Sequence, residues 1–204
     1  MSSHGIIPAE PDEASSWIGA SLAQGSALAL GVAQRLSEFN TAWIVASEMP
    51  GSGPVEIDDQ ARGIRTADAD TAMQWLLALC LDAGLRTLIV EDDLARRGDR
   101  QRPLPFYSAF LGDRVLRWVD LAETSDGAIH LLRSGASGYP LNAYLCVEPG
   151  VMPTAEGTAI LTAADVPRLV TATCAVIASV YDAETYVVLM NSEIAKAIVD
   201  KCNN

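Results

Sequence analysis

Lysine is almost missing from this 204-residue chain. It occurs only at Lys196 and Lys201, although the chain holds twelve arginines. A phosphate-binding loop of the G-x-x-x-x-G-K-[ST] type needs a lysine beside the phosphates, and a Schiff-base enzyme needs a lysine amine. Residues 1–195 therefore supply no lysine for either kind of site.

Cysteine and histidine are also scarce, and neither is clustered. The two histidines, His4 and His130, are too few and too far apart to favour a His-based triad or a multi-histidine metal site. The cysteines are far apart as well, which excludes C-x-x-C zinc or redox motifs. Most of them lie in apolar runs, so we expect buried thiols in a reducing cytoplasm. The four are Cys80, Cys146, Cys174 and Cys202.

Basic residues are outnumbered, with 14 Lys and Arg against 26 Asp and Glu and a net charge of −12. This balance argues against direct binding to nucleic acid. Residues 14–34 carry no charge at all, but acidic rather than basic residues precede them, unlike in a signal peptide. The run also contains serine, glutamine and glycine, so it is too polar for a membrane helix. We expect a buried helix here and no membrane contact.

The remaining patterns predict a flexible N-terminal arm over residues 1–16 and a single α/β domain over residues 17–204. Apolar runs that follow helical segments favour a mainly parallel central sheet flanked by helices, with part of the sheet antiparallel towards the C-terminal half. The predicted helices cover residues 21–37, 67–84, 162–182 and 192–201. The predicted strands cover residues 41–47, 85–93, 115–121, 127–133, 141–148 and 185–190.

The stretch GASLAQGSALAL, residues 19–30, has the spacing of a phosphate-binding loop that runs into a helix. Gly19 matches the first glycine of the pattern, and Ser26 matches the hydroxyl that binds Mg²⁺. Gln24 replaces the second glycine, and Gly25 replaces the lysine. The alternative is a small-residue helix that packs against a sheet.

Acidic residues follow the next two predicted strands. Glu48 follows AWIVAS, and Glu91 and Asp92 end TLIVED. In this order the chain resembles the core of the RecA-like ATPases over residues 19–93, including relatives of the SulA and mutagenesis-associated type that have lost the ATPase. The resemblance implies a vestigial nucleotide site at Gly19, Ser26, Glu91 and Asp92, with Glu48 in the place of the catalytic glutamate.

Because the loop lacks its lysine, we expect no cofactor and assign no catalytic residue, although Glu48 would be the catalytic residue of an active ATPase. The expected function is that of a pseudo-ATPase that binds a protein partner or itself, as a regulator or assembly subunit in the DNA-damage (SOS) response or in cell division. One alternative is a weak, oligomer-dependent NTPase that binds Mg-ATP and uses arginines in trans. The arginines that could do this, or could bind a protein partner, are Arg96, Arg97, Arg100 and Arg102.

Two further alternatives remain open. An unrelated α/β adaptor or immunity-type binding protein would also fit the acidic composition. LRTLIVEDD also looks like the first strand of a response-regulator receiver, although Glu148 would then stand in place of the phosphorylated aspartate. The acids of residues 91–93 could hold a divalent cation or could form a solvated loop.

Overall fold

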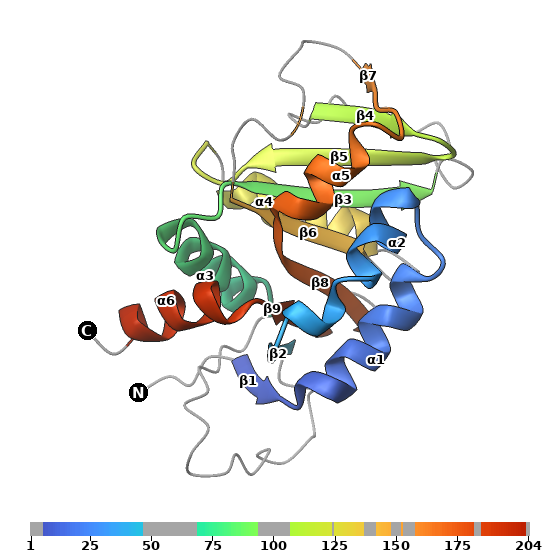
Figure 1. Cartoon of the computed structure of the whole chain (residues 1–204). Coiled ribbons are helices and arrows are strands. Elements are labelled where there is room, and N and C mark those ends of the chain that lie inside the picture. Colours follow the sequence, from blue (N-terminus) through green and yellow to red (C-terminus); the bar gives the residue numbers. More distant parts are fainter. Residues whose placement is uncertain are drawn as a thin grey trace.

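The structure is a computed structural model, and it describes residues 6–46, 69–93, 107–123, 125–136, 142–147, 152, 158–181 and 185–202. Within these ranges the strands form one sheet, in the order β1-β2-β9-β8-β6-β3-β5-β4-β7 (Figure 1). The strands are β1 (Ile6–Ala9), β2 (Thr41–Ala46), β3 (Thr87–Asp93), β4 (Tyr107–Leu111), β5 (Arg114–Asp120), β6 (Asn142–Cys146), β7 (Thr158–Ile160), β8 (Thr173–Tyr181) and β9 (Thr185–Met190).

The prediction of a mainly parallel, RecA-like sheet is wrong. Every described pair of neighbouring strands is antiparallel except β4 with β7 at one edge. The strands β2 and β3 run in the same direction, but β9, β8 and β6 lie between them. Their apolar runs arise because helices cover both faces of the sheet, a condition that gives antiparallel strands the same pattern as buried parallel ones.

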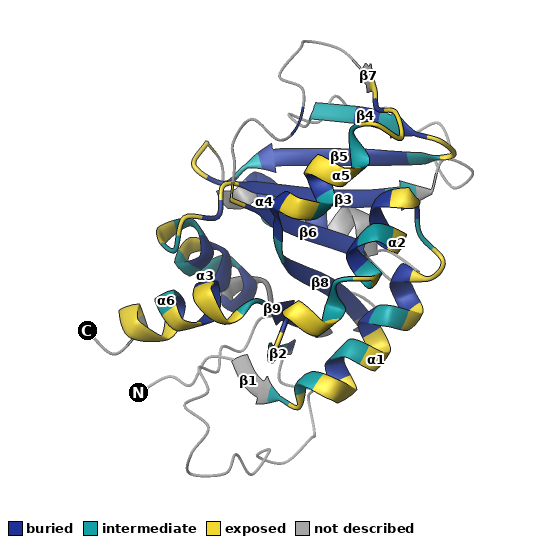
Figure 2. Ribbon diagram, viewed as in Figure 1, coloured by how far each residue is buried: buried dark blue, intermediate teal, exposed yellow. Residues whose placement is uncertain are grey.

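Helices pack on both faces of the sheet (Figure 1). One face carries α1 (Pro11–Leu22), α2 (Ala27–Ala33) and α5 (Val166–Ala172), and η1 (Leu36–Glu38) follows α2. The other carries α3 (Ala69–Asp82), α4 (Ser125–Ala136) and α6 (Ser192–Cys202). Each layer buries its own hydrophobic cluster against the sheet, whose strands are largely buried (Figure 2). The described part of the chain is therefore a sandwich of helices, sheet and helices.

Two of the predicted elements have a different secondary structure. Residues 127–133, predicted as a strand, lie in α4, where Ala128, Leu131 and Leu132 are buried and His130 is exposed, as helical spacing requires. The predicted helix over 162–182 ends at Ala172, and the chain continues as β8. The β8 sequence TCAVIASVY contains several β-branched residues, which favour a strand.

The N-terminal segment also differs from expectation. Residues 1–16 were expected to form a flexible arm. Instead β1 (residues 6–9) lies inside this range, and α1 (residues 11–22) begins inside it and extends past its end. Pro11 suits the first turn of a helix, because its missing N–H would have no intrahelical partner there. Ala14, Ile18 and Leu22 then recur at helical spacing and are buried against the sheet. The single helix predicted over 21–37 is divided between the end of α1, a loop, α2 and η1.

Candidate functional site

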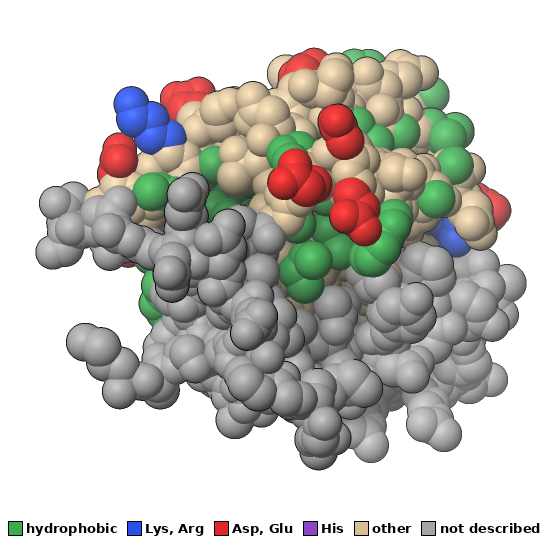
Figure 3. All heavy atoms as spheres, turned by 90° about the horizontal axis from the view of Figure 1, so that it is seen from below, with side chains coloured by type: hydrophobic (Ala, Val, Ile, Leu, Met, Phe, Trp, Pro, Cys, Tyr) green, Lys and Arg blue, Asp and Glu red, His purple; other side chains and the backbone are tan. Residues whose placement is uncertain are grey.

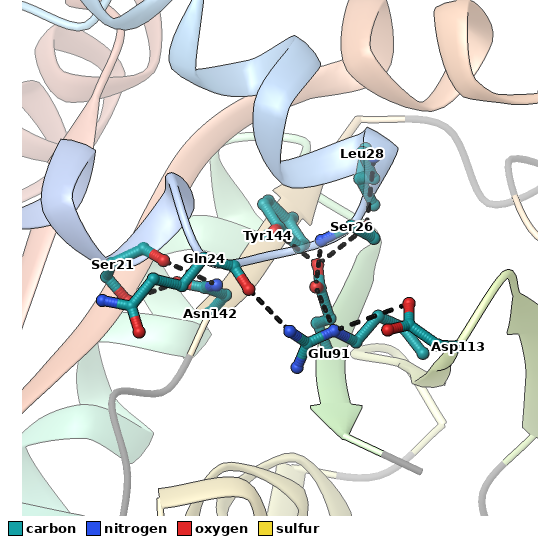
Figure 4. A network of polar contacts seen from close by, with 9 residues as sticks. Ser21, Gln24, Ser26, Leu28, Glu91, Asp113, Asn142 and Tyr144 are labelled. Carbon is teal, nitrogen blue, oxygen red and sulfur yellow. Dashed lines mark hydrogen bonds and ion pairs between the residues drawn. The ribbon is translucent and has the colours of Figure 1, made fainter. Parts of the chain in front are cut away.

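Two residues of the suspected nucleotide site do meet in the structure. Ser26 is the N-cap of α2, and Glu91 lies in β3. The backbone N–H of Ser26 donates a hydrogen bond to Glu91 Oε1 at 2.6 Å, and Ser26 Oγ donates to Glu91 Oε2 at 3.0 Å (Figure 4). The Glu91 carboxylate therefore lies at the start of α2, the place where a phosphate-binding loop would hold its phosphate.

The same carboxylate has two further neighbours, which the sequence did not single out. Tyr144 Oη donates to Glu91 Oε2 at 2.9 Å, and Arg114 Nε lies 3.9 Å from Glu91 Oε1. Arg114 also donates from its guanidinium to the carbonyl oxygen of Gln24 at 2.6 Å. The Glu91 side chain is only 2% exposed, so its charge is balanced within the protein rather than by water.

A second pair of polar side chains fixes the end of α1. Ser21 Oγ donates to Asn142 Oδ1 at 2.6 Å, and both residues are buried. Asn142 is paired with Glu91 in the register between β6 and β3. The contact of Ser21 with Asn142 and the contact of Ser26 with Glu91 therefore lie on adjacent strands. The Glu91 network is the set Ser21, Ser26, Glu91, Arg114, Asn142 and Tyr144. The signal for part of it was present in the sequence, because Asn142 and Tyr144 are polar residues in an otherwise apolar run.

Gly25, the residue in place of the lysine, is held closely between α2 and the sheet. A Cβ atom at this position would collide with Ala29 Cβ and would lie 3.0 Å from Glu91 Oε1 and 3.1 Å from Asn142 Nδ2. The backbone can approach the sheet this closely only because glycine has no side chain. A lysine could not occupy this position in the described conformation.

Gly19 does not open a loop. It lies within α1, where its carbonyl oxygen accepts a hydrogen bond from the N–H of Ala23 at 3.0 Å. An added Cβ would make an ordinary contact with Leu36 at 3.4 Å. The turn that precedes α2 begins after Leu22, so the glycine that matched the motif belongs to the preceding helix.

Asp92 points to the opposite face of the sheet from Glu91, because successive side chains of a strand alternate. Its carboxylate forms an ion pair with Arg117 of β5. The two acids therefore cannot hold one cation together. In the described ranges no group of three or more His, Cys, Asp or Glu residues is placed to hold a metal ion. Glu48 and the arginines at 96, 97, 100 and 102 lie outside the described residues.

The Glu91 network has a structural role, because its hydrogen bonds hold the start of α2 against the sheet. The pKa of the Tyr144 phenol is raised well above its ordinary value, first by burial and then by the charge of Glu91 and the hydrogen bond to it. Tyr144 therefore remains a protonated donor at neutral pH. The Ser26 hydroxyl both donates to Glu91 and accepts from the N–H of Leu28 at 3.1 Å, which caps α2.

Comparisons with protein-family models, with curated proteins and with solved structures found no match. Among the residues that the structure describes, no helix combines the length and the apolar character needed to span a bilayer.

Proposed function

We propose that this chain is a non-catalytic protein that acts through protein–protein contact, as a regulator or an assembly subunit. The observation that carries the proposal is the hydrogen bond from the Ser26 N–H to the buried Glu91 carboxylate. A nucleotide phosphate at the start of α2 would have to displace this carboxylate or lie against it, and both carry negative charge.

The energetic balance also disfavours a nucleotide. Glu91 accepts hydrogen bonds from the backbone and hydroxyl of Ser26 and from Tyr144. Hydrogen bonds to a charged group contribute about 1.5–3 kcal/mol each, and an unpaired buried charge costs more. Gly25 stands where the lysine would be. The positive side chain beside the loop, Arg114, already lies 3.9 Å from Glu91 and donates to the carbonyl oxygen of Gln24, so a phosphate would have to compete with these contacts for it.

The surface of the described residues supports contact with a protein. Its exposed large hydrophobic side chains include Trp17 on α1, Leu30 on α2 and Ile160 on β7. Viewed from below, the described part of the molecule presents acidic and hydrophobic side chains next to one another (Figure 3). Burial of Cys80 and Cys146 as free thiols is consistent with a reducing cytoplasm, where we place the protein. A role in the DNA-damage response or in cell division stays a prediction of the RecA-like resemblance, and the proposal made here does not depend on it.

Isothermal titration of the full chain with Mg-ATP tests the proposal. We expect no binding heat up to millimolar nucleotide. Micromolar binding with turnover would contradict the proposal. Hydrolysis that increases with protein concentration, and that the double variant Arg96→Ala with Arg97→Ala abolishes, would identify the oligomer-dependent NTPase instead.

A further inference from the structure

We draw no further inference here: the strongest candidate, the outer face of α1, where the exposed Trp17 follows the acidic first turn with Asp12 and Glu13, carries no proposal because nothing among the residues that the structure describes shows what covers it.

Discussion

The two faces of the sheet hold their helices in different ways. On the face covered by α3, α4 and α6, a hydrophobic cluster that includes Leu76, Leu131 and Ile198 packs the helices against the strands. The face covered by α1, α2 and α5 has a comparable hydrophobic cluster and, in addition, the buried Glu91 network. Hydrophobic packing is enough to place a helix on a sheet, but it does not fix a loop.

The difference explains what the polar residues do. Directional hydrogen bonds from Ser26 and Tyr144 to Glu91 hold the short segment between α1 and α2 at one position over β3 and β6. A buried network of this kind is stable only when its members are all paired, so changes within it should cost more than changes at exposed polar residues.

The largest effect should follow the loss of the central carboxylate. Glu91→Ala leaves the Ser26 N–H and the Tyr144 hydroxyl without their acceptor, and we expect the free energy of unfolding to fall by about 3 kcal/mol. Urea denaturation measures it. The control Glu123→Gln, at an exposed turn residue, should change stability by less than about 0.5 kcal/mol. If both variants changed the free energy of unfolding equally, the Glu91 network would contribute nothing to the stability of this face.

Gly19 and Gly25 should respond in opposite ways to the same substitution. Gly25→Ala forces a Cβ against Ala29 and Glu91 and should destabilise the protein by about 1–3 kcal/mol. Gly19→Ala adds a methyl group within α1, where alanine is the better helix former, and should be neutral or stabilising by up to about 1 kcal/mol. Thermal unfolding compares them. A neutral Gly25→Ala would refute the close approach of the loop to the sheet.

The last effect is confined to alkaline pH and involves both faces. Burial raises the pKa of the Cys80 thiol, on the α3 side, and of the Cys146 thiol, on the α1 side, from 9.0 to about 12. Both thiols therefore favour the folded state fully below pH 9, and this contribution is lost as the pH rises from 9 towards 12. In that window each thiol should lower the free energy of unfolding by up to about 1.4 kcal/mol per pH unit.

Urea denaturation at a series of pH values between 8 and 10 measures this slope, and Cys80→Ala and Cys146→Ala should each remove a similar share of it. If only one variant changes the pH dependence of the free energy of unfolding, the two faces do not shield their thiols from water equally.

The elements that were predictable from the sequence are those with one dominant pattern. The helix predicted over 67–84 follows from helical spacing, and the structure has α3 over Ala69–Asp82. The strand predicted over 185–190 follows from an unbroken apolar run, and the structure has it as β9. Strand direction was not predictable, because runs buried on both faces look the same in parallel and antiparallel sheets. The proximity of Ser26 to Glu91 was anticipated through the motif, although for phosphate binding and not for the internal contact that the structure shows.

The sequence marks Asn142 and Tyr144 as polar residues in an apolar run, but it does not show that they lie beside Glu91. Asn142 and Tyr144 lie beside Glu91 because β6 is next to β3, and this neighbour relation depends on the strand order of the whole sheet. Ser21 reaches Asn142 from α1, which depends on where that helix packs. The role of Gly25 likewise depends on how closely its backbone approaches Asn142, which no local pattern encodes.

Hydrogen exchange of the Ser26 amide tests the central claim most directly. This N–H donates to Glu91 at 2.6 Å, so it should be protected from exchange in the free protein, and saturating Mg-ATP should not change its rate. An amide that exchanges freely in the free protein and becomes protected only when Mg-ATP is added would show that the start of α2 is an open phosphate site, and would contradict the account.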